Sequence, residues 1–178
     1  MLQAFCLERC GNATMSLANA QASLDDATQH VQQREQFGRP LVEFQAVQMK
    51  LAECKMRVDA ARLLIMRAVA AADAEALSSR GGGGGGGGGG GEEAEQPRAL
   101  CFPSTLDSSL AKCFSNENAV EVCSTAMQLF GGYGFSTSLP LERRMRDVLG
   151  WRIAGGAIDI QKTNIASAMV GRRFNQRK

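Results

Sequence analysis

The sequence predicts an all-α protein, an antiparallel four-helix bundle, on three observations. Outside one run of glycines, Gly81 to Gly91, the 178-residue chain is rich in alanine, leucine, methionine and glutamine, which favour helices. Apolar residues recur at steps of three and four along several long stretches. Glycine or proline stands where these stretches end. Since 44% of the residues are hydrophobic, residues 1–178 can bury one ordinary core and are expected to form a single domain.

Two long helices are expected in the first half of the chain. The first runs from about Gln3 to Arg34 and must stop at Gly38 and Pro40 in "QFGRPL", and the second runs from about Phe44 to Ala76. Each carries one apolar seam. The first seam comprises Ala13, Leu17, Ala20, Leu24, Ala27 and Val31, and the second comprises Val47, Leu51, Cys54, Val58, Ala61, Ile65 and Ala68.

Two further helices are expected in the second half. The third ends before "GGYGF" and carries Leu106, Leu110, Cys113, Val120, Cys123, Met127 and Phe130, and the fourth carries Ile158, Ile165, Ala168 and Met169. Long helices with seams at this spacing pack as a left-handed bundle. Arg80 to Pro103 is a low-complexity linker that we expect to be disordered, because polyglycine has no side chain to bury.

Composition argues against several classes of function. The net charge is only +2 and both signs are interspersed, so nucleic acid is not an expected partner. The six cysteines form no CxxC pair and His30 is the sole histidine, so no metal site is expected. We interpret the cysteines as reduced thiols of an intracellular protein. No apolar run approaches the ~20 residues of a membrane span.

Three segments are weak signals when taken singly. "QREQFGRP" is typical of a helix end, "QLFGGYGF" of a helix C-cap, and "ERRMRD" of a solvated surface turn. Their order and spacing are more specific. Together with "LDSSLAK" and "IDIQK", they resemble the C-terminal domain of the acyl-CoA dehydrogenase family, over nearly the whole chain except residues 81–98. In that family an N-terminal helical domain and a middle β domain precede the bundle. Neither is present in this chain.

The resemblance implies an FAD site shared between the subunits of a homodimer or homotetramer. Arg34 corresponds to an arginine that binds the FAD diphosphate of the neighbouring subunit, and guanidinium suits phosphate oxygens. Gln36 and Phe37 would lie beside it. Gln128, Gly131 and Gly132 would lie against the dinucleotide, where a Cβ would prevent close approach. Asp159 would accept a hydrogen bond near the flavin, or would only face the dipole of the last helix as a first-turn carboxylate.

The family reaction is α,β-dehydrogenation of an acyl-CoA thioester, with electrons passed to an electron-transferring flavoprotein. Most members carry the glutamate base in a Tyr-Glu-Gly-Thr segment before the last helix, but this chain reads Ala-Gly-Gly-Ala, 154–157. A minority branch, which includes isovaleryl-CoA and long-chain acyl-CoA dehydrogenases, places it on the first bundle helix. There Glu8 and Arg9 match its Leu-Glu-Arg. The resemblance therefore implies Glu8 as base, Gly155 N–H as donor to the thioester oxygen, and Arg9 as a residue that orients substrate or helix.

Two other functions stay open from the sequence. The chain could be a noncatalytic bundle for oligomerisation or partner binding, or part of an acyl-CoA oxidase that uses oxygen. We expect the isolated chain to be inactive, because the family's other two domains are missing. The family implies the mitochondrial matrix in a eukaryote or the cytoplasm in a bacterium. Acyl chain length and branching are not determined by these residues.

Overall fold

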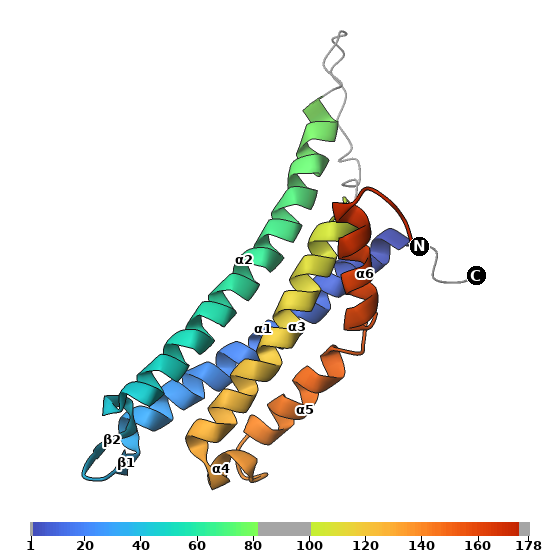
Figure 1. Ribbon diagram of the computed structural model, residues 1–178. Coiled ribbons are helices and arrows are strands. Elements are labelled where there is room, and N and C mark those ends of the chain that lie inside the picture. The colour runs from blue at the N-terminus through green and yellow to red at the C-terminus, as the bar shows by residue number, and fades with distance from the viewer. Residues whose placement is uncertain (1, 82–100, 175–178) are drawn as a thin grey trace, which may run out of the picture.

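The computed structural model describes residues 2–81 and 101–174, and it is all-α apart from one short hairpin. Three long helices lie side by side (Figure 1): α1 (Leu2–Gln33), α2 (Gln45–Gly81) and α3 (Thr105–Phe130). Helix α3 is central and packs against α1, α2, α5 and α6. The predicted all-α class is confirmed.

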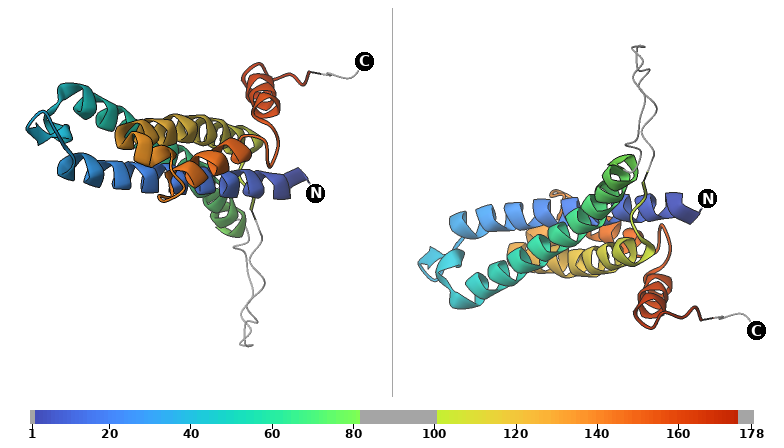
Figure 2. Two further views of the ribbon diagram at one scale, coloured as in Figure 1. Left: turned by 90° about the horizontal axis from the view of Figure 1, so that it is seen from below. Right: turned by 90° about the horizontal axis from the view of Figure 1, so that it is seen from above.

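The fourth side of the bundle holds two shorter helices where one was expected. Helix α5 (Leu141–Trp151) packs on α1 and α3, and α6 (Ile158–Met169) packs on α3. The turn 152–157 separates them, so α6 stands off to one side near the N-terminal end of α1 (Figure 2). One turn of helix, α4 (Gly132–Phe135), follows α3 and leads toward α5.

The interpretation of "ERRMRD" as a surface turn is wrong, because this segment belongs to α5. Its flanking apolar residues Leu141 and Val148 are seven positions apart, which places them on one face of a helix, and both are fully buried. Arg144, between them, forms an ion pair with Asp26 of α1. The arginines between these two apolar residues made the segment look like a solvated turn, so its apolar helix face was missed.

A tight hairpin connects α1 to α2. Strands β1 (Glu35–Gln36) and β2 (Arg39–Pro40) pair antiparallel, and the short 3-10 helix η1 (Leu41–Glu43) follows. Both residues between the strands have positive φ, 53° at Phe37 and 77° at Gly38, as in the two-residue turns that suit twisted hairpins. Helix α1 ends at Gln33, close to the predicted end at about Arg34. Arg34 is the first residue after the helix.

The predicted seams of α1 and α2 form the core. All six seam residues of α1 are buried, as are the last five of α2, while Val47 and Leu51 are half-buried. On α3, Cys113 and Cys123 are buried and the other predicted residues are half-buried. The prediction is wrong for the end of α6, where Ala168 and Met169 are exposed, because α6 packs chiefly on α3 within the described part of the chain.

Helix α2 extends five residues beyond the predicted end, through Arg80 and Gly81 of the predicted linker. The predicted disorder of that linker concerns chiefly residues 82–100, which lie outside the described residues. Of the helices that are described, none combines the length and apolar content that a bilayer span requires.

Gly134 is required where α4 turns back on α3. A Cβ built on Gly134 would lie 2.5 Å from the backbone oxygen of Met127 and 2.9 Å from its Cα, so the backbone would have to move. We expect Gly134→Ala to lower the free energy of unfolding by about 1–3 kcal/mol, as overpacking does. Gly132→Ala is the matched control, because a Cβ there meets nothing within 4 Å. Equal urea midpoints for the two variants would contradict this prediction.

The buried thiols make stability depend on alkaline pH. Burial raises the pKa of Cys10 and of Cys113 from 9.0 to about 11. Between pH 9 and 11 the unfolded thiols ionise while the folded ones keep their protons, so the free energy of unfolding falls as pH rises. Urea unfolding at intervals from pH 8 to pH 11 measures this fall. Cys113→Ala should reduce the slope, and a slope equal to that of wild type would refute the assignment.

Candidate functional site

At the N-terminal end of α1, the structure brings Glu8 and Gly155 together. Gly155 lies in the turn between α5 and α6 with φ of 65°, and Glu8 is an exposed residue of α1. A Cβ atom built on Gly155 would lie 3.4 Å from Oε1 of Glu8. The carboxylate of Glu8 therefore lies in the space beside Gly155 that a side chain at that position would enter.

A cluster of buried polar side chains lies beneath this turn. Lys112 of α3 donates hydrogen bonds to the backbone oxygens of Trp151 and Ala154. Asn12 of α1 also donates to Ala154, at 3.1 Å, and accepts one from Asn116 of α3 at 2.8 Å. Asn116 donates to Trp151 as well, at 2.6 Å. We call Asn12, Lys112 and Asn116 the carbonyl clamp.

The electrostatics of this end are dominated by Lys112, which is fully buried. Burial lowers the pKa of Lys112, while the nearby Glu8 carboxylate acts in the opposite sense. The last carbonyls of α5 form the negative end of its helix dipole, which suits a cation. Arg9, half-buried beside Glu8, donates to Cys6 Sγ at 3.8 Å, and its Nε has no partner among the described residues.

The second glycine of the turn is fixed by a glutamine. Gly156 has φ of 96°, and a Cβ there would overlap Nε2 of Gln161, although a side-chain end can shift. Gln161 is fully buried, donates to the backbone oxygen of Gly156 at 3.3 Å, and accepts from Ser109 at 3.0 Å. These bonds attach the start of α6 to α3.

Four of the predicted cofactor-binding residues gather at the opposite end of α1. Arg34, Gln128, Gly131 and Gly132 line one pocket of about 580 Å³. Gly131 has φ of 63°, and no atom lies within 4 Å of a Cβ built on either glycine, so the pocket reaches their backbone. The pocket is also lined by His30, Leu41, Leu129, Phe130, Tyr133 and Ser136.

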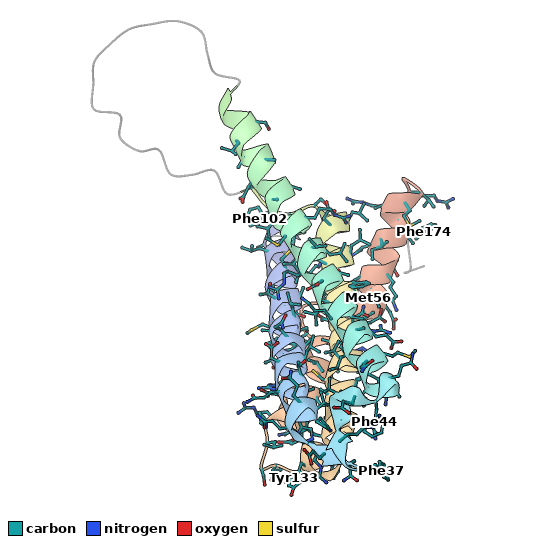
Figure 3. The ribbon with its side chains drawn as sticks, turned by 90° about the vertical axis from the view of Figure 1, so that its left-hand side faces the viewer. Phe37, Phe44, Met56, Phe102, Tyr133 and Phe174 are labelled. Atoms are coloured by element: carbon teal, nitrogen blue, oxygen red, sulfur yellow. The ribbon has the colours of Figure 1, made fainter. Side chains whose placement is uncertain are left out.

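His30 forms part of the wall of this pocket. Its ring stacks on Phe130 with centroids 4.0 Å apart, and Tyr133 follows on α4. Burial and the Arg34 guanidinium lower the pKa of His30. Phe37, Phe44 and Tyr133 lie at this same end of the molecule (Figure 3).

Three of the predicted cofactor-binding residues lie outside the pocket. Gln36 and Phe37 are in the hairpin, and the Phe37 side chain is 92% exposed, with its ring at 72° to that of Phe44 and their centroids 6.3 Å apart. Asp159 is an exposed carboxylate in the first turn of α6, at the Glu8 end of the molecule. In this place it faces the dipole of α6 as a first-turn carboxylate, and its hydrogen bond near the flavin stays a prediction.

The sequence interpretation missed the carbonyl clamp, Gln161 and His30. A signal for the clamp was present in α3, where Ser108, Lys112, Ser115 and Asn116 form a polar stripe at helical spacing within an apolar helix. Lysine is rarely buried without such partners, so Lys112 within "LAKCF" was a hint. His30 had no comparable pattern.

Comparison with known proteins gives the family. Residues 1–85 and 91–170 match the family described as acyl-CoA dehydrogenase, C-terminal domain, and this chain belongs to that family. A 3-sulfinopropanoyl-CoA desulfinase of Paraburkholderia xenovorans is 33% identical over 100% of this chain and 39% of its own length. The short-chain-specific acyl-CoA dehydrogenase of Megasphaera elsdenii is 34% identical over 86% of this chain and 33% of its own.

Solved structures agree with this assignment. The butyryl-CoA dehydrogenase of Megasphaera elsdenii superposes with a TM-score of 0.74 and 32% identity, over 93% of this chain and 37% of its own. A glutaryl-coenzyme A dehydrogenase in complex with glutaryl-CoA gives a TM-score of 0.77 and 31% identity, over 99% and 38%. The chain thus spans well under half the length of these relatives.

Proposed function

We propose that this chain is the C-terminal part of a flavin-dependent acyl-CoA dehydrogenase in which Glu8 removes the α-proton of an acyl-CoA thioester. The observation that carries the proposal is the 3.4 Å between Oε1 of Glu8 and the position of a Cβ on Gly155. A glutamate on α1 can thus deliver a carboxylate beside the turn where most relatives carry theirs. A positioned carboxylate of this kind is a general base, and the backbone N–H of Gly155 is the donor for the thioester oxygen.

The residues at the opposite end fit FAD. Arg34 supplies a cation for a diphosphate, and the open backbone at Gly131 and Gly132 admits a flat or extended ligand. The amide of Gln128 adds a donor and an acceptor. When bound, FAD would accept the β-hydrogen as hydride, and an electron-transferring flavoprotein would reoxidise it. The chain's own part is to hold the cofactor and to take the α-proton.

The separation of the two ends supports a shared cofactor in an oligomer. Glu8 and Arg34 lie near opposite ends of α1, about 40 Å apart at the rise of about 1.5 Å per residue. One FAD is too short to reach both, so each chain would serve two cofactors. Helix α2 also presents an exposed apolar stripe to a partner chain, Met49, Met56, Leu63 and Leu77 (Met56 labelled in Figure 3).

A second candidate function is desulfination of a 3-sulfinoacyl-CoA. It is favoured by similarity over the whole chain to the Paraburkholderia xenovorans desulfinase. That reaction consumes water, replaces the carbon–sulfur bond by a carbon–hydrogen bond and releases the sulfur group as sulfite. It leaves no double bond in the acyl chain, so it does not call for net transfer of electrons to an acceptor. Release of sulfite from 3-sulfinopropanoyl-CoA distinguishes it from acyl-CoA-dependent reduction of an electron acceptor.

We expect purified residues 1–178 to be colourless and inactive, because the flavin ring would rest on N-terminal helical and middle β domains that residues 1–178 do not include. An enzyme that contains this domain together with N-terminal helical and middle β domains should be yellow. It should reduce an electron-transferring flavoprotein when given acyl-CoA. Absorbance at the flavin bands, measured on both proteins at equal concentration, tests the difference. A stoichiometric flavin complex of the isolated chain would refute the first expectation, and a full enzyme inert toward acyl-CoA would refute the second.

A further inference from the structure

The carbonyl clamp holds two backbone carbonyls, and one of them belongs to the peptide group that joins Ala154 to Gly155. Two of its members, Asn12 from α1 and Lys112 from α3, donate to the Ala154 oxygen. The third, Asn116, ties Asn12 to the neighbouring carbonyl of Trp151. Three side chains from two helices thus determine where one carbonyl points.

Because a peptide group is planar, fixing the Ala154 carbonyl also fixes the direction of the Gly155 N–H. The described chain has no cis peptide bonds, so the Ala154 carbonyl and the Gly155 N–H point in opposite directions in one plane. With the oxygen held against buried Lys112, the N–H points away from the core. No acceptor for it is recorded within residues 2–81 and 101–174.

We propose that Lys112, with Asn12, is a positioning residue of the acyl-CoA site, which acts by holding the Ala154 carbonyl so that the Gly155 N–H stays aimed at the thioester oxygen. This inference rests on the proposed function and deepens it. The fixed donor lies beside Glu8, so the base and the donor meet the same substrate.

Besides fixing the position of this peptide group, the positive charge of Lys112 polarises it. A cationic donor on a peptide oxygen draws electron density from the amide, and linked hydrogen bonds strengthen one another by about 10–30% per bond. The Gly155 N–H is thereby a stronger donor just where negative charge develops on the thioester oxygen. The clamp should therefore affect the affinity for bound substrate little and stabilise the transition state more, because its effect is largest when that negative charge is present.

Nuclear magnetic resonance can observe this peptide alone. Ala154-Gly155 is the only Ala-Gly pair in the sequence. Labelling with carbonyl-¹³C alanine and ¹⁵N glycine therefore gives one correlation peak, from residues 1–178 without cofactor. In Lys112→Met we expect the Ala154 carbonyl carbon and the Gly155 amide proton to move upfield. Lys162→Met is the control, because Lys162 is exposed and pairs with Glu117. A peak unchanged in folded Lys112→Met overturns the proposal.

A titration of the wild-type chain covers the case in which Lys112→Met does not fold. Burial lowers the pKa of Lys112, so it loses its proton before ordinary lysines as pH rises. The groups that face it are Glu8 and Arg9 from α1 and Cys113 from α3, while α5 offers backbone oxygens. Carbon detection should show the Ala154 signal move over that pH range, also in Cys113→Ala. A signal that stays in place while Lys112 titrates overturns the proposal.

The flavin-loaded enzyme separates this inference from the proposed function. There Lys112→Met should lower kcat at least about tenfold, less than the ~10²–10³ lost when an oxyanion donor is removed outright. KM and flavin content should change less than kcat. Unchanged kcat in that variant overturns the positioning role. A wild-type enzyme without acyl-CoA activity overturns the proposed function and the role at a thioester, while the Ala154 signal still decides whether the clamp holds the peptide.

Discussion

In an intact enzyme that contains this chain, Glu8→Gln is expected to lower kcat for acyl-CoA dehydrogenation by about 10²–10⁴-fold. Glutamine keeps the size of the side chain but cannot accept the α-proton. The carboxylate of Glu8 is the acidic group beside Gly155, whose added Cβ would lie 3.4 Å from its Oε1. Flavin absorbance should be unchanged, because Glu8 is remote from the pocket that contains Arg34.

Two variants sharpen this test. Glu53→Gln, on the exposed face of α2, is the matched control and should keep wild-type turnover. Moving the carboxylate, as Glu8→Gly with Gly155→Glu, should restore only part of the activity. The φ of 65° at Gly155 disfavours a side chain, typically by about 1–2 kcal/mol, and its Cβ would lie 3.3 Å from Asn12 Nδ2. If Glu8→Gln kept wild-type turnover, the assignment of the base would be wrong.

The second large effect is expected at the other end of α1. Arg34→Met should weaken FAD binding in the intact enzyme by about 10- to 100-fold, the size of a lost hydrogen bond to a charged group. Arg34 lines the pocket with Gly131 and Gly132 and brings a permanent cation to it. Flavin retained after dilution, measured by fluorescence of the released cofactor, reports the change.

Arg39→Met is the control for Arg34. Arg39 belongs to the same hairpin, but its guanidinium stacks on the Phe44 ring at 4.1 Å and does not line the pocket. Flavin retention should stay at the wild-type level in this variant. If both variants lost flavin equally, the hairpin as a whole would be responsible, and the specific role of Arg34 would be refuted.

Helix periodicity predicted the core well because each seam reports burial directly. Ala13, Ala27 and Val31 recur on one face of α1, and that face is the one that packs into the core, so all three are buried. Periodicity failed for α5, whose short apolar face of Leu141 and Val148 is embedded among arginines. It failed also at the end of α6, where Met169 follows the seam but is exposed, since none of the helices described in residues 2–81 and 101–174 buries it.

The sequence by itself determined the fold class and the family, because these depend on periodicity and on the order of short motifs, and it predicted two groups of candidate site residues. Only the tertiary structure decided how those groups are assembled. It placed Glu8 beside Gly155 and brought Arg34 to Gly131, although each pair is far apart in the chain. It also buried Lys112 under the Ala154 carbonyl. Contacts of this kind depend on how α1, α3 and the α5–α6 turn pack, and no local pattern of residues encodes that packing.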